Sequence, residues 1–62
     1  MNMVKRRDLV KEVEAQGLRS TGGTNHETFK KPGFQTSIPR HREIDEDTAR
    51  DIRKQAGIEK RR

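Results

Sequence analysis

The sequence predicts an α+β domain whose elements follow the order α-β-β-β-α. Apolar residues recur with a helical period near both ends of the chain and with a period of two between residues 18 and 38. Glycine or proline separates each of these segments from the next. Short turns join antiparallel neighbours, so we expect a three-stranded antiparallel sheet with the two helices on one face.

The first helix is expected over residues 6–16. Asp8 lies near its start, and Gly17 follows its end as a residue that tolerates positive φ. The apolar side of this helix is formed by Leu9, Val10 and Val13.

The second helix is expected over residues 46–56, with Asp45 as its N-cap and Gly57 at its end. Ile44, just before the cap, is positioned to pack against Ala49 as a hydrophobic staple. The narrow apolar face of this helix consists of Ala49, Ile52 and Ala56.

The three strands are separated by two turns that contain glycine. We expect the order strand, turn, strand, turn, strand over residues 18–21, 22–25, 26–31, 32–33 and 34–38. Pro39 ends the last strand, because proline cannot donate a hydrogen bond to a neighbouring strand.

Side-chain alternation predicts where His26 points. Phe34 and Ile38 share one face of the third strand, and these bulky apolar residues are expected to face the helices. Phe29, the one large apolar residue of the second strand, is expected to do the same. His26 lies an odd number of residues from Phe29, so it should point to the opposite, open face, together with Thr28 and Lys30.

Length and composition indicate one small intracellular domain over residues 1–62, with a flexible basic tail at 59–62. A chain of this size buries only about 60% of its unfolded surface, so the core is thin. The sequence has no cysteine, which fits a reducing cytoplasm. No apolar stretch approaches the roughly 18 residues of a membrane span, and no signal-peptide core is present, so we expect a cytoplasmic protein without a membrane partner.

The charge is distributed unevenly along the chain. The net charge is +5, and between residues 19 and 42 the only acidic residue is Glu27, against Arg19, Lys30, Lys31, Arg40 and Arg42. Residues 43–57 carry more acidic than basic side chains. A basic segment suggests a polyanionic partner, because lysine and arginine release counterions when they bind phosphates. For any single one of these residues, a solvated surface position is the simpler interpretation.

Three sequence elements together resemble the HicA family of small prokaryotic toxins. They are "GGTNHETF", then "IPRHREI", then a helix that ends "RKQAGI", and the similarity extends from "RRDLVKEVEAQG" to Ile58. The resemblance implies a fold like that of a double-stranded-RNA-binding domain. It also implies a toxin that cleaves mRNA through a histidine on the second strand, arrests translation and growth in a stress response, and is neutralised by a HicB-like antitoxin. That histidine corresponds to His26.

The chemistry of a ribonuclease fits an exposed histidine. Imidazole exchanges protons near neutral pH, and RNA supplies its own nucleophile, the 2′-hydroxyl. We therefore predict that His26 is the general base or acid, that Lys30 and Arg40 stabilise the phosphate charge, and that the backbone N–H groups of Gly23 and Thr24 form an anion nest.

Other residues leave alternatives open. His41, between Arg40 and Arg42, is a candidate acid or phosphate contact, although a loop residue bonded to the backbone is the simpler interpretation. The acidic run at 45–47 suggests a metal site for a nuclease, but capping of the second helix explains it better. We therefore expect neither a metal nor another cofactor.

Two non-catalytic functions compete with the ribonuclease. One is a double-stranded-RNA-binding module of the same fold, which would have the same charge and architecture. The other is a structural protein of a larger RNA–protein particle, which would have little need for the paired glycines and the histidine. A requirement for His26 in an effect on RNA, beyond binding, distinguishes the enzyme from both.

Overall fold

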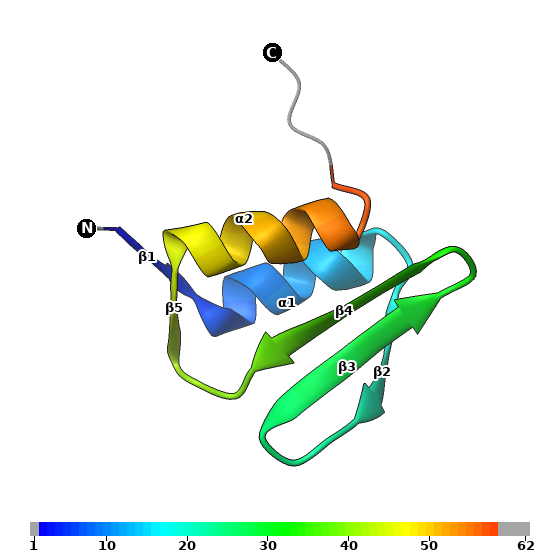
Figure 1. The fold of residues 1–62 in the computed structure, drawn as a ribbon, viewed down its shortest axis with the longest axis horizontal. Coiled ribbons are helices and arrows are strands. Elements are labelled where there is room, and N and C mark those ends of the chain that lie inside the picture. The colour runs from blue at the N-terminus through cyan, green and yellow to red at the C-terminus, as the bar shows by residue number, and fades with distance from the viewer. Residues whose placement is uncertain (1, 59–62) are drawn as a thin grey trace.

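Two helices and five strands follow one another along residues 2–58, the part of the chain that the computed structural model describes (Figure 1). Their bounds are β1 (Met3–Lys5), α1 (Arg6–Ala15), β2 (Arg19–Gly22), β3 (His26–Lys31), β4 (Phe34–Pro39), β5 (Glu43–Asp45) and α2 (Glu46–Gln55). The elements α1, β2, β3, β4 and α2 confirm the predicted order α-β-β-β-α. The very short strands β1 and β5 are additional. The tail predicted at 59–62 lies outside the described residues.

Both helices begin and end close to the predicted residues. Asp45 caps α2, since its carboxylate accepts a hydrogen bond from the Thr48 backbone N–H at 3.3 Å. Gly17 and Gly57, just after the two helices, have φ angles of +97° and +85°. Left-handed φ is the conformation in which glycine commonly ends a helix. One feature differs from α2: no side chain caps the start of α1, where Lys5 occupies the N-cap position.

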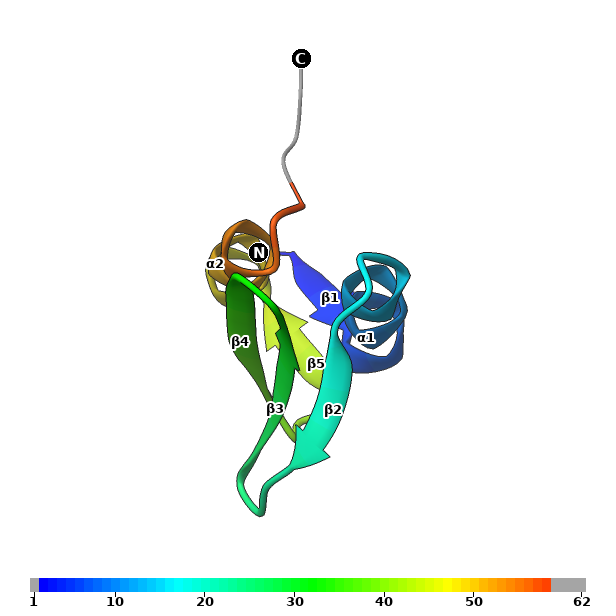
Figure 2. The same ribbon diagram turned by 90° about the vertical axis from the view of Figure 1, so that its right-hand side faces the viewer.

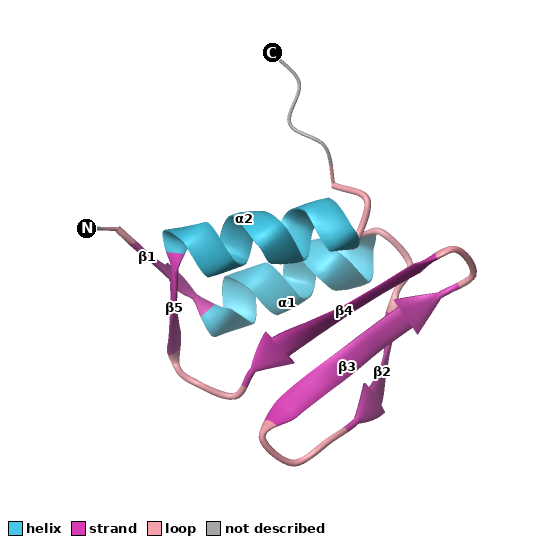
Figure 3. Ribbon diagram, in the orientation of Figure 1, coloured by secondary structure: helices cyan, strands magenta, loops and turns pink. Residues whose placement is uncertain are grey.

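The central sheet is an antiparallel meander in the order β2-β3-β4 (Figure 3). In its register, His26 lies opposite Pro39, Phe29 opposite Thr36, and Lys30 between Arg19 and Gln35. The ladder between β2 and β3 shifts register between Ser20 and Gly22, next to the turn that precedes β3. Directly paired residues share a face of an antiparallel sheet, so this register fixes which side chains lie together.

The second sheet, which was not predicted, is a two-stranded pairing of β1 with β5. Val4 lies opposite Ile44, and Lys5 opposite Glu43. The pairing joins the start of α1 to the start of α2, and it brings Arg6 beside the loop that follows β4. The backbone N–H of Arg6 donates to the carbonyl oxygen of Arg42 at 2.9 Å.

The core lies between the helices and one face of the three-stranded sheet. Figure 2 shows the two helices side by side and seen almost end-on. Their buried side chains form one cluster with residues from the strands, as predicted for helices on one face of the sheet. Its members are Leu9, Val13, Leu18, Phe29, Ile38, Ile44, Ala49, Ile52 and Ala56.

The prediction that Phe34 faces the helices is only partly confirmed. It lies on the same strand face as the buried Ile38, but its side chain is 41% exposed. At this end of the sheet α2 has already finished, so the ring packs beside Gly57, and the Lys31 ammonium lies 4.7 Å from the ring centroid. Thr36, between Phe34 and Ile38, is buried and donates a hydrogen bond to Gln55 at 2.9 Å.

Candidate active site on the open face of the sheet

His26 is the first residue of β3 and is exposed. Phe29, three residues later, is fully buried against the helices. The predicted orientation of His26, away from the core, is therefore confirmed. The register adds neighbours on the same open face, from all three strands: Arg19, Thr28, Lys30, Gln35 and Ser37.

The turn before β3 depends on glycine. Gly22 and Gly23 have φ angles of +95° and +130°. A Cβ atom on Gly23 would lie 2.1 Å from the carbonyl oxygen of His26, closer than any real contact, so the turn folds directly back onto the backbone of His26. Thr24 follows Gly23 in this exposed turn. Binding of an anion by the N–H groups of Gly23 and Thr24 stays a prediction.

Arg40 joins this turn to the loop that follows β4. Its guanidinium donates two hydrogen bonds to the Gly23 carbonyl oxygen, from Nε at 3.2 Å and from Nη2 at 2.9 Å. Its backbone N–H donates to the carbonyl oxygen of Asn25 at 3.3 Å. The fold thus brings together three of the predicted site residues, Gly23, His26 and Arg40, and His41 and Arg42 follow as exposed loop residues.

Lys30 lies farther from His26 than the predicted roles require. The two residues are on the same face of β3, but they are four positions apart. At the rise of a β-strand this separation is about 13 Å. The same phosphate group is therefore not within easy reach of both side chains, and Lys30 instead pairs with Arg19 of β2 as a separate basic position on the open face.

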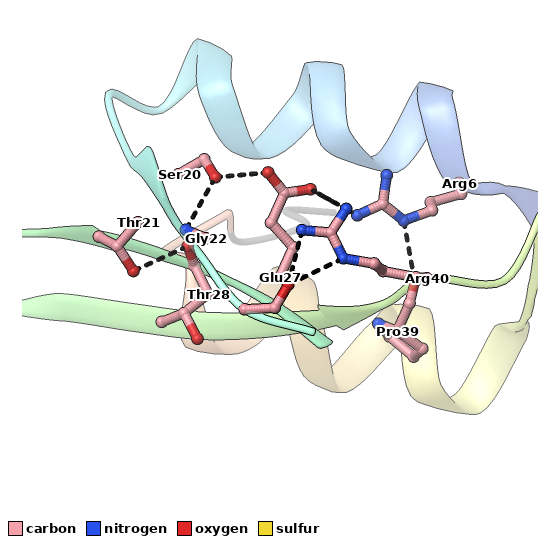
Figure 4. A network of polar contacts seen from close by, with 9 residues as sticks. Arg6, Ser20, Thr21, Gly22, Glu27, Thr28, Pro39 and Arg40 are labelled. Carbon is pink, nitrogen blue, oxygen red and sulfur yellow. Dashed lines mark hydrogen bonds and ion pairs between the residues drawn. The ribbon is translucent and has the colours of Figure 1, made fainter. Parts of the chain in front are cut away.

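Glu27 is a residue that sequence reasoning did not identify as part of the site (Figure 4). Its carboxylate points to the inner face of the sheet and accepts hydrogen bonds from Arg6 Nη2, at 2.6 Å, and from the Ser20 hydroxyl. Arg40 Nη1 lies 3.7 Å from the same carboxylate. The Ser20 hydrogen bond, then the Arg6 hydrogen bond, hold the pKa of Glu27 below its ordinary value, against partial burial, which raises it.

A signal for this role was present in the sequence. Glu27 is two residues from Phe29, so strand alternation places it on the core side, where a charged group needs partners. Only 18% of its side chain is exposed, and 21% of that of Arg6. Arg6 is also bonded to the end of β4, since its Nε donates to the carbonyl oxygen of Pro39 at 2.9 Å.

Two further sequence predictions concern a metal ion and the membrane, and the structure adds one surface hollow. Within residues 2–58, no group of three or more His, Cys, Asp or Glu side chains is arranged to hold a metal ion. No helix in this part of the chain has the length and apolar character needed to cross a membrane. A hollow of about 500 Å³ is lined by Glu14 and by residues 17–20, at the Arg19 end of the sheet rather than at His26.

An exposed imidazole held on a strand can accept or donate a proton, and the adjacent basic loop can attract phosphate.

Comparison with known proteins identifies the family of the chain. No curated protein and no solved structure matches the chain significantly. A family model described as the HicA toxin of bacterial toxin–antitoxin systems matches residues 6–58. The match covers both helices and the strands β2 to β5. The chain therefore belongs to the HicA toxin family.

Proposed function

We propose that this toxin is an endoribonuclease, an mRNA interferase, in which His26 carries out proton transfer. Membership of the family makes the chain a toxin of a toxin–antitoxin system with a HicB-type antitoxin as its partner. The observation that carries the proposal is the position of His26, which is exposed at the start of β3 on the face opposite the core. A histidine in this position is free to meet a bound phosphodiester.

The reaction that fits these residues uses the 2′-hydroxyl of RNA as the nucleophile. His26 takes the proton from the 2′-oxygen, which attacks the adjacent phosphorus atom. The bond from phosphorus to the 5′-oxygen breaks, and that oxygen leaves with a proton from an acid or from water. The products are a 2′,3′-cyclic phosphate and a 5′-hydroxyl. The histidine thus supplies general base catalysis.

The basic residues divide into two groups around the proposed path of the RNA. Arg40, His41 and Arg42 form the exposed loop that follows Pro39, the residue paired with His26, so in this proposal the loop contacts the RNA beside the scissile phosphate. The Arg40 guanidinium also donates to the Gly23 carbonyl oxygen and lies close to Glu27. Lys30, farther along β3, would contact a neighbouring phosphate of the same RNA molecule. In this proposal mRNA is the substrate, and the chain requires neither a metal nor another cofactor.

A cleavage assay on a short RNA tests the proposal. The wild-type chain should cut the RNA, and His26→Ala should not, although it should melt at the wild-type temperature because the imidazole is exposed. Arg50→Ala, at an exposed position of α2, is the control and should cut normally. Cleavage by His26→Ala at the wild-type rate would contradict the proposal.

The substrate and the buffer provide two further arms of the assay. An RNA with a single deoxyribose at the scissile position should bind without being cut, because its nucleophile is missing. Cleavage should persist in excess EDTA. A requirement for added Mg²⁺ would contradict the metal-independent reaction. Binding without cleavage, by every form of the protein, would favour the non-catalytic RNA-binding module.

A further inference from the structure

We propose that Glu27 is the positioning residue of the active site, and that it holds the segments around His26 in one arrangement through Arg6 and Arg40. The inference rests on the proposed role of His26 in RNA cleavage. Glu27 follows His26 in β3, so the two side chains point to opposite faces of the sheet. Glu27 therefore does not touch the RNA, and its effect on the reaction passes through the backbone.

The Glu27 carboxylate is where three separate parts of the chain meet. Arg6 reaches it from the start of α1, Ser20 from β2, and Arg40 from the loop after β4. These residues are far apart in the sequence, and Glu27 is the acidic group that they share. The cluster lies between the start of α1 and the sheet, as Figure 4 shows.

The two arginines extend the cluster to the backbone on each side of His26. Arg6 donates from Nε to the carbonyl oxygen of Pro39, the residue opposite His26 in β4, and from its backbone N–H to the carbonyl oxygen of Arg42. Arg40 donates twice to the carbonyl oxygen of Gly23, in the turn before β3. Arg6 and Arg40, the two arginines close to the Glu27 carboxylate, are thus bonded to three backbone segments. These are the end of β4, the loop after it and the turn before β3.

Loss of the Glu27 charge would leave two guanidinium groups close together without an anion between them. An unpaired, partly buried charge is costly, and two like charges repel each other, so the arginines would separate and release the backbone groups that they hold. Catalysis is sensitive to such a displacement, because a misplacement of about 1 Å can lower a rate by about 100-fold.

The chain contains a matched control for this experiment. Glu12 and Arg53 form a second carboxylate–arginine pair, 2.8 Å apart, which joins α1 to α2. Glu12→Gln and Glu27→Gln make the same chemical change and raise the net charge of +5 by one unit each. The Glu12 side chain is more exposed than that of Glu27, 40% against 18%, so thermal melting is measured for both variants.

The expected kinetics separate positioning from simple electrostatics. Removal of a negative charge attracts RNA more strongly, which lowers KM or leaves it unchanged in both variants. Positioning adds a loss of kcat of about 10- to 100-fold in Glu27→Gln alone, because the rate depends on geometry at the reacting atoms. The amide NMR signals of Gly23 and His26 should shift in Glu27→Gln and stay in place in Glu12→Gln.

Two milder variants keep the test decisive if Glu27→Gln is poorly folded. Ser20→Ala removes one hydrogen bond to Glu27 without a change of charge, and Arg6→Lys keeps the charge but cannot bond both Glu27 and Pro39 through a guanidinium fork. Both should lower kcat, measured at a temperature at which circular dichroism shows each variant folded. A wild-type kcat in these folded variants would overturn the inference.

The His26→Ala variant, assayed in parallel, shows which proposal has failed. If His26→Ala is inactive and Glu27→Gln has the wild-type kcat, only the positioning role is wrong. If Glu27→Gln and Glu12→Gln lose kcat equally, the effect is a general loss of stability and the positioning role is again wrong. If His26→Ala cleaves RNA like the wild type, the proposed function fails and the positioning role fails with it.

Discussion

Arg40 donates two hydrogen bonds to the carbonyl oxygen of Gly23, at 3.2 Å and 2.9 Å. These two hydrogen bonds join the loop after β4 to the turn before β3, so they hold together the two segments that flank His26 in space. The arginine can reach this oxygen because Gly22 and Gly23 allow the turn to fold back on the strand that it begins. The geometry of this turn is therefore the first feature to test.

Gly23→Ala should destabilise the protein more than Gly22→Ala. Both residues have positive φ, which costs about 1–2 kcal/mol for alanine. At Gly22 a Cβ atom would meet nothing within 4 Å, whereas at Gly23 it would lie 2.1 Å from the His26 carbonyl oxygen, and that backbone must move. Urea unfolding of the two variants measures the difference in unfolding free energy. Equal losses of unfolding free energy in the two variants would contradict the close approach of the turn to the His26 backbone.

The contribution of Glu27 to stability should be lost in acid. Because its folded-state pKa lies below the ordinary value of 4.5, the ionised carboxylate stabilises the fold at pH values above the unfolded pKa. That stabilisation disappears as the pH falls below about 4.5 and through the lower folded pKa. The melting temperatures of the wild type and Glu27→Gln should therefore differ at pH 6 and converge toward pH 3. A difference that stays constant over this range would contradict the assignment.

Lys30 should contribute one phosphate contact to RNA binding. In a His26→Ala background, which leaves the RNA intact, Lys30→Gln should weaken binding and reduce the slope of log K against log salt by about 0.7 to 0.9. Arg50→Gln, at an exposed position of α2, removes the same charge and should leave the slope nearly unchanged. Binding titrations at several salt concentrations measure both slopes. Identical slopes for the two variants would remove Lys30 from the RNA path.

The HicB-type antitoxin should inhibit by covering the open face around His26. This face carries the exposed cations Arg19 and Lys30, so a partner that competes with RNA is expected to present carboxylates there. Binding to the folded state alone should stabilise the toxin by about 4 kcal/mol at a thousandfold excess over Kd. Cleavage and melting of the co-expressed complex test both expectations.

Two outcomes would contradict this masking. A partner that binds tightly but leaves RNA cleavage unchanged would show that the antitoxin does not mask the active site. Inhibition that is insensitive to Lys30→Glu would instead indicate steric blocking, with little electrostatic contribution.

The sequence by itself determined the main elements of the domain and the direction of His26. Helical and strand periods are properties of neighbouring residues, so they predict a strand over residues 26–31 and a helix cap at Asp45 without knowledge of the fold. Strand alternation then placed His26 opposite the buried Phe29. Such conclusions need only the local geometry of the backbone.

Only the tertiary structure decided what surrounds His26. The strands β1 and β5 have three residues each, too few to show a period, and they pair across most of the chain. Arg6 and Glu27 are 21 positions apart, and they meet because that pairing places the start of α1 beside the sheet. Long-range ion pairs depend on how elements pack and where strands are paired. Side-chain periodicity carries no information about either.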